Sequence, residues 1–169
     1  MRGNSRSLQF PKVGEPFELS SYNFDPLELV EEEHAPEEWR HAGVVIDEAQ
    51  IRVFRFIVTP SEACTFQKAT DFILASQCFS PEGQWLRAFK HKYPVPPEHR
   101  GDLYPGLDPE HRLERVGKLM ICVADASWIS PEDDTYFPCL EGRGDSWEEG
   151  VIGTYSMLDP GILWIVEEV

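Results

Sequence analysis

The sequence lacks a long hydrophobic run. No apolar run in its 169 residues is close in length to the ~18 consecutive apolar residues needed to span a membrane. The first residues, MRGNSRSLQFPKVGEPF, carry positive charge, but no apolar segment follows them, so no secretory signal is expected. These features predict a soluble, cytoplasmic protein that does not contact a membrane.

Familiar catalytic and metal-binding patterns are also missing. The chain has no G-x-S-x-G or S-x-x-K motif, and its five histidines show no H-x-x-x-H spacing. Its four cysteines form no C-x-x-C pair, so we expect free thiols rather than a zinc site or a redox pair. They are Cys64, Cys78, Cys122 and Cys139. We therefore predict no catalytic residue, no metal ion and no cofactor.

Basic residues are scarce and unevenly placed. The chain has 15 Lys and Arg against 30 Asp and Glu, a net charge of −15. Residues 15–60 contain eleven acids and three bases, residues 61–120 contain eight of each, and residues 121–169 contain eleven acids and only Arg143. Nucleic acid phosphates and anionic lipids would repel such a chain, and a basic protein surface would attract it. We therefore expect no direct nucleic acid binding.

The length and composition predict one domain over residues 1–169. Apolar residues make up 41% and aromatic residues 12% of the chain, enough to form a core without disulfides or metals. Residues 1–40 have several prolines and a polar start, so we expect a partly extended N-terminal arm with a short helix.

Proline and glutamate mark the expected helix starts. The sequence Pro-Glu-His-Arg occurs at 97–100 and again at 109–112, and similar Pro-Glu pairs occur elsewhere. Proline fits the first helical turn and glutamate favours the positive end of the helix dipole. This helix-start pattern explains the repeat better than a metal site formed by His99 and His111. It predicts helices near 60–78, 80–93 and 109–116.

Apolar, β-branched segments mark the expected strands. Residues 43–47 and 51–58 are separated by a short acidic turn and suggest one hairpin. Residues 118–124 read as a central strand, and residues 150–157 and 161–168 suggest a second hairpin. The order of these elements predicts an α+β fold with a mostly antiparallel sheet of about five strands, covered on one face by two main helices.

The segment 125–149, DASWISPEDDTYFPCLEGRGDSWEE, combines acids with aromatic residues and is expected to be largely loop. Aromatic anchors inside a charged rim are typical of an electrostatically steered interface. In this hypothesis Trp128 and Trp147 are the anchors and the carboxylates pair with Lys and Arg. The predicted binding residues are Trp128, Glu132, Asp133, Asp134, Tyr136, Asp145, Trp147, Glu148 and Glu149. The plainer alternative is a solvated acidic loop whose aromatic rings turn inward.

These features favour an acidic protein-binding domain that occupies a basic partner surface. Inhibitors, immunity-type proteins and DNA mimics have this character, and the partner would be a toxin, a nuclease or an effector. One alternative is a small enzyme or small-ligand-binding domain that has an aromatic pocket and uses Asp125 with a histidine. Another is that the charge reflects general adaptation to salt. A deep cavity with the carboxylate and a histidine in hydrogen-bond reach would favour the enzyme.

Overall fold

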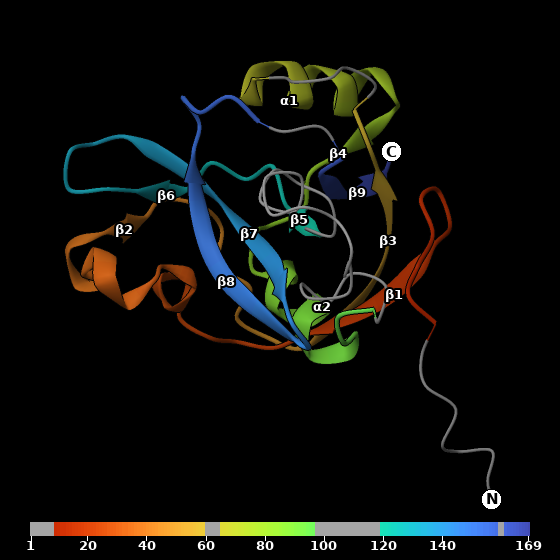
Figure 1. Ribbon diagram of the computed structural model, residues 1–169, viewed down its shortest axis with the longest axis horizontal. Coiled ribbons are helices and arrows are strands. Elements are labelled where there is room, and N and C mark those ends of the chain that lie inside the picture. The colour runs from red at the N-terminus through yellow and green to blue at the C-terminus, as the bar shows by residue number, and fades with distance from the viewer. Residues whose placement is uncertain (1–8, 60–64, 97–118, 159–160) are drawn as a thin grey trace, which may run out of the picture.

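The computed structural model describes residues 9–59, 65–96, 119–158 and 161–169 (Figure 1). In these ranges the chain forms a curled, mixed sheet with two α-helices, which confirms the α+β class. Along the sheet the strand order is β1-β3-β9-β5-β7-β6-β2, with β4 paired to β9 and β8 paired to β7. The strands are β1 (Phe17–Ser21), β2 (Arg40–His41), β3 (Gln50–Ile57), β4 (Cys78–Phe79), β5 (Met120–Cys122), β6 (Trp128–Ile129), β7 (Thr135–Arg143), β8 (Ser146–Gly153) and β9 (Leu163–Glu168).

The sheet is larger than the sequence predicted. The described residues contribute nine strands, and three of these are only two residues long, too short to leave a periodic signal in the sequence. Most neighbours run antiparallel, but β5 lies parallel to β9, with Ile121 opposite Leu163. The expected sheet of about five antiparallel strands is therefore corrected in both size and direction.

The two helices, α1 (Phe66–Ala75) and α2 (Trp85–Lys92), lie on opposite faces of the sheet, with β5 and β9 between them (Figure 1). Successive residues of a strand point to opposite faces. On β9, Trp164 and Val166 share one buried cluster with Ile73 of α1, whereas Ile165 belongs to the cluster that contains Phe89 of α2. The prediction that both helices cover one face is therefore wrong.

Helix α2 was predicted well. It lies inside the expected range 80–93 and ends at Lys92, with Tyr93 as an extended C-cap directly before Pro94. Helix α1 starts later than the expected residue 60, because the Thr65 side chain accepts a hydrogen bond from the Lys68 N–H and caps it. Residues 60–64 lie outside the described ranges, as do Cys64, His99, His111 and the helix expected at 109–116.

Neither predicted hairpin forms. Residues 43–47 lie outside the strands, and β3 pairs instead with β1 and β9, where Phe54 faces Phe17 and Phe56 faces Ile165. The partner of β8 is β7, and β9 pairs with β3, β4 and β5. Hydrophobic pattern marks a strand, but tertiary contacts choose its partner.

The segment 125–149 is mostly strand rather than loop. It contains β6, all of β7 and the start of β8, and β7 and β8 form the longest hairpin among the described residues. Arg143 pairs with Ser146 at its tip, and Gly144 takes a positive φ of 58° in the two-residue turn. A turn of this kind needs a residue that tolerates the left-handed region, which glycine does.

The described part of the N-terminal arm contains β1 and three 3-10 helices instead of one short helix. These are η2 (Pro26–Leu29), η3 (Glu32–His34) and η4 (Pro36–Glu38). They lead into β2, which pairs with β6 and so brings residues 25–41 beside the β6–β7 turn. We call residues 25–41 together with residues 130–134 the acidic lobe; it forms the left end of the molecule in Figure 1.

Within the described ranges, neither helix combines the length and hydropathy that a bilayer-spanning segment requires.

Candidate functional site

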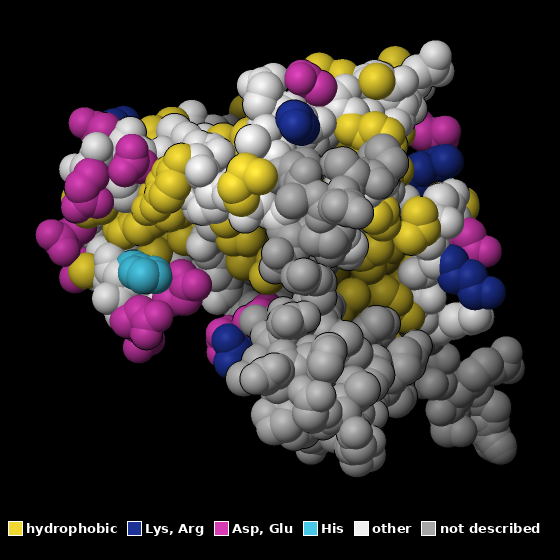
Figure 2. All heavy atoms as spheres, turned by 45° about the horizontal axis from the view of Figure 1, so that its top comes forward, with side chains coloured by type: hydrophobic (Ala, Val, Ile, Leu, Met, Phe, Trp, Pro, Cys, Tyr) yellow, Lys and Arg dark blue, Asp and Glu magenta, His cyan; other side chains and the backbone are white. Residues whose placement is uncertain are grey.

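The acidic lobe concentrates negative charge at one end of the molecule. Arg40 is its only Lys or Arg, and Figure 2 shows carboxylates along this end with one histidine among them. Arg40 Nη2 lies 2.8 Å from Asp133 Oδ1, so this cation is already paired. The carboxylates of the lobe are those of Asp25, Glu28, Glu31, Glu32, Glu33, Glu37, Glu38, Glu132, Asp133 and Asp134. The sequence hypothesis included only the last three.

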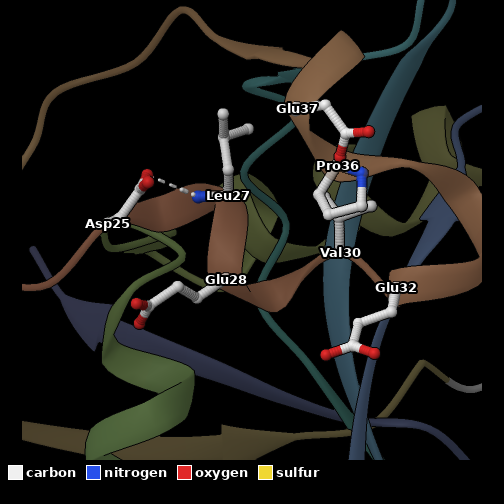
Figure 3. A pocket seen from close by; sticks show the side chains of 7 residues that line it. All are labelled: Asp25, Leu27, Glu28, Val30, Glu32, Pro36 and Glu37. Carbon is white, nitrogen blue, oxygen red and sulfur yellow. Dashed lines mark hydrogen bonds between the residues drawn. The ribbon is translucent and has the colours of Figure 1, made fainter.

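A groove crosses the surface of the lobe. It has a volume of about 420 Å³, and its apolar lining consists of Leu27, Val30 and Pro36. Figure 3 shows Leu27 beside the carboxylates of Asp25 and Glu28, and across from them Val30 and Pro36 between the carboxylates of Glu32 and Glu37. The acidic surface is therefore concave here, and apolar area lies between its charges.

Trp128 holds the lobe to the sheet from inside. Its side chain is 0% exposed and packs with Leu29 and Val30, and its Nε1 donates a hydrogen bond to the Pro26 carbonyl oxygen at 2.9 Å. An indole buried in this way is satisfied within the protein. The prediction that Trp128 is an interface anchor is therefore wrong.

Trp147 is also a core residue. It is 9% exposed, packs against Phe89 of α2, and donates from Nε1 to the Tyr93 carbonyl oxygen at 2.7 Å. The alternative in which the aromatic rings of segment 125–149 turn inward is thus correct for both tryptophans, and Trp147 does not serve as an exposed anchor.

Glu149 is committed to an internal ion pair. Arg87 of α2 donates from Nε and Nη2 to the two oxygens of Glu149, both at 2.8 Å, and from Nη1 to Glu28 Oε1 at 2.6 Å. These hydrogen bonds raise the pKa of Arg87. The arrangement ties α2, β8 and η2 together, so Glu149 is a structural residue rather than a free charge of an interface.

The remaining predicted residues separate into two groups. Glu132, Asp133, Asp134 and Tyr136 lie at the lobe, near the start of β7. Asp145 and Glu148 lie at the other end of the β7–β8 hairpin, where Glu148 Oε1 is 3.4 Å from Arg143 Nε. Strands of this length separate the groups by roughly 20–25 Å. The nine predicted residues therefore do not form one patch.

Glu31 attaches the lobe to the edge of β8. Its carboxylate accepts a hydrogen bond from the Val151 backbone N–H, and burial raises the pKa of Glu31. A Cβ atom on Gly150 would lie 2.2 Å from Glu31 Oε1, so only glycine leaves room for this contact. The neighbouring Oε2 is buried and has no hydrogen-bond partner among the described residues.

Tyr155 is the residue that the sequence analysis missed. It follows β8, is 69% exposed, and its hydroxyl lies 3.0 Å from that of Tyr136. The hydrogen bond to Tyr155, together with burial, raises the pKa of Tyr136 to about 12. No sequence signal marked Tyr155, because residues 150–157 were expected to continue as a strand.

The alternative site at Asp125 is only partly assembled. Folding does bring His41 close to Asp125, and the charge of Asp125 acts to raise the pKa of His41. Burial has the larger effect, and the pKa of His41 is lowered. However, Asp125 accepts hydrogen bonds from the Gly83 N–H at 2.7 Å and from the Ser127 hydroxyl, whereas neither ring nitrogen of His41 has a hydrogen-bond partner within the part of the chain that the structure describes. Asp125 therefore joins two loops and does not orient His41.

A shallow cleft of about 310 Å³ lies beside Asp125. Its lining comprises Gly43, Val44, Ser80, Pro81, Glu82, Ala124, Asp125 and Ser127, without His41 or an aromatic ring. Among the described side chains, no three His, Cys, Asp or Glu residues are arranged to hold a metal ion. Asp125 and His41 therefore do not share the cavity that the enzyme hypothesis requires.

No family model, curated protein or solved structure shows significant similarity to this chain. The acidic lobe, with its groove and its exposed tyrosine, is therefore the candidate site on the strength of its geometry and charge alone.

Proposed function

We propose that this protein binds a positively charged protein through the acidic lobe, as an inhibitor or immunity-type protein or a DNA mimic does. A toxin, a nuclease or an effector is the class of partner that fits. The observation that carries the proposal is a lobe with ten carboxylates and Arg40 as its only Lys or Arg, in which four of the carboxylates line a groove together with apolar side chains.

Several of these carboxylates have no internal role. Glu32, Glu33, Glu37 and Glu38 are exposed, and their carboxylates have no hydrogen-bond or ion-pair partner among the described residues. Like charges gathered on one surface repel one another and lower the stability of the fold. A basic partner would relieve this repulsion, because its Lys and Arg would pair with the carboxylates.

The binding mechanism is electrostatic and steric. The field of the lobe would steer a basic partner and raise the association rate, and the groove would accept the apolar stem of a long basic side chain while its rim pairs with the charged end. If the partner uses the same surface to bind nucleic acid phosphates, the lobe would occupy that surface and block it.

A pair of charge variants tests the proposal. The lobe variant carries Glu32→Gln, Glu33→Gln, Glu37→Gln and Glu38→Gln. The control variant removes four exposed carboxylates elsewhere, through Glu15→Gln, Glu18→Gln, Asp47→Asn and Glu48→Gln. Both lose the same net charge, so any difference between them reports the position of the charge.

Each protein is immobilised and exposed to native lysate at low salt, and bound material is eluted with rising salt. We expect the wild type and the control to capture the same basic protein and the lobe variant to lose it. The association rate should fall steeply with ionic strength. Equal capture by the lobe variant, or an association rate that does not change with salt, would reject the proposal.

A further inference from the structure

Tyr136 and Tyr155 form an aromatic pair at the margin of the acidic lobe. Tyr136 is the second residue of β7, and Tyr155 follows the end of β8. Their ring centroids are 6.0 Å apart with planes at 86°, and their hydroxyl oxygens are 3.0 Å apart. Figure 2 shows hydrophobic side chains exposed between the carboxylates of this end of the molecule. The pair therefore adds apolar surface to a charged region.

Tyr155 is exposed but held in one position. A Cβ atom on Gly153 would lie 2.4 Å from Tyr155 Cε2, so the ring lies against the bare backbone of Gly153. Gly153 is directly opposite Tyr136 in the hairpin. The chain on either side is fixed by the Thr154 N–H, which donates to the Thr135 carbonyl oxygen at 3.0 Å, and by a Thr135–Thr154 hydroxyl contact at 2.8 Å. The ring is thus pre-positioned at little further entropic cost.

The surroundings of the pair are suited to a cation. Trp39 packs edge-on against Tyr136 at 4.7 Å and fixes that ring from behind. The carboxylates of Asp134 and Glu132 are close enough to contribute to the raised pKa of Tyr136. A positive charge over an aromatic face and beside a carboxylate gains from both, and the planar guanidinium of arginine also stacks on the ring.

We infer that Tyr155, supported by Tyr136, is the contact on which the basic partner places an arginine side chain. This inference rests on the proposed function and adds to it a preference for arginine over lysine. Lysine would gain from the carboxylates but would lose the stacking of a flat group on the tyrosine ring. Tyr155 thereby takes the anchor role that the buried Trp128 and Trp147 cannot fill.

Two synthetic peptides of equal charge separate the contributions. Hexa-arginine and hexa-lysine, both with blocked ends, are titrated into the full chain at low salt and followed by calorimetry. The wild type should bind hexa-arginine about two- to fivefold more tightly, the range expected for one exposed cation–aromatic contact. Tyr155→Leu should abolish this ratio and lower the affinity for hexa-lysine less than the affinity for hexa-arginine.

Two further variants show whether the position of the ring matters. Tyr22→Leu is the matched control, because Tyr22 is also exposed but stacks on His91 away from the pair, and it should keep the arginine preference. Gly153→Ala should displace the Tyr155 ring and reduce the preference without removing the tyrosine.

The outcomes distinguish this inference from the proposed function. If both peptides bind the wild type equally and the lobe variant loses both, the acidic lobe remains the binding surface and only the arginine contact is rejected. If the preference survives Tyr155→Leu, the inference also fails. If neither peptide binds, the proposed function fails with it. Self-association that Tyr155→Leu abolishes would assign the surface to a second copy of the chain and overturn the inference.

Discussion

Arg87 and Glu149 form a bidentate ion pair in which each of two guanidinium nitrogens lies 2.8 Å from one carboxylate oxygen. Their side chains are only 14% and 13% exposed, so water screens the pair weakly. Because Arg87 also bonds to Glu28 and lies over the ring of Phe24 at 4.5 Å, it is the point at which α2, β8 and the acidic lobe meet.

Replacing Arg87 by methionine should therefore be strongly destabilising. It would leave the nearly buried Glu149 with only the longer contact to Lys90 Nζ, at 3.5 Å, and removing the main partner of a buried ion pair typically costs about 3–5 kcal/mol. Urea unfolding at neutral pH measures the loss. Arg87→Lys keeps the charge but not the bidentate geometry and should cost less. A loss below about 1 kcal/mol for Arg87→Met would show that the pair lies outside the cooperative fold.

Gly150→Ala should weaken the attachment of the lobe to β8. The new methyl group would displace the Glu31 carboxylate and remove its hydrogen bond to Val151, at a cost of about 1–2 kcal/mol. Combining it with Glu31→Ala tests the cause by urea unfolding. If the clash with Glu31 is responsible, the double variant should lose less stability than the sum of the two single variants; strict additivity would point to another cause.

Acidification should destabilise the fold through His41. Burial lowers the pKa of His41 below its usual value of 6.5, so below pH 6.5 the unfolded chain binds a proton more readily than the folded one. The contribution is fully present above pH 6.5 and is lost as the pH falls toward the lowered pKa of the folded state.

Unfolding free energies of the wild type and His41→Asn, measured from pH 7.5 to pH 5.5, should show the slope only in the wild type. Burial raises the pKa of Glu31 and of Glu167, and these groups act with the opposite sign above pH 4.5, but they do so in both proteins and cancel in the comparison. An identical pH slope in both proteins would contradict the assignment to His41.

Cys122 and Cys139 should be inert toward thiol reagents in the folded protein. They face each other across β5 and β7, and burial raises the pKa of both thiols, that of Cys139 to about 12. The thiolate is the reactive form. A variant with Cys64→Ser and Cys78→Ser, which keeps only Cys122 and Cys139, should therefore react with a thiol dye at pH 8 only after unfolding in urea. Rapid labelling of this variant in the absence of urea would contradict the burial.

The sequence predicted those elements whose signals are local. Helix α2 was found because Pro81 and Pro94 lie on either side of it. Strand β7 was missed partly because Pro138 argues against a strand interior. In the structure Pro138 lies opposite Val123, one residue beyond the end of β5. Its carbonyl oxygen accepts a hydrogen bond from the Val123 N–H at 3.4 Å, so the proline does not need an N–H of its own there.

The sequence showed how many acidic residues the lobe would contain but not that the two segments of the lobe would lie together. The excess of acids in residues 15–60 was evident, yet the interface was assigned to segment 125–149 alone. What joins the two is the pairing of β2 with β6, where Arg40 faces Ile129 and His41 faces Trp128. A contact between two-residue strands that are far apart in the chain has no periodic signature.

The central position of β9 bears on how the chain is made. This strand lies between β3 and β5 and also carries β4, so the β1–β3 ribbon and the β5–β7–β8 ribbon share no other neighbour in the sheet. During translation neither ribbon can pair with β9 until residues 163–168 leave the ribosome, so Phe56 and Ile121 lack their β9 neighbours until then. A nascent chain stalled before Leu163 should therefore be a substrate for chaperones.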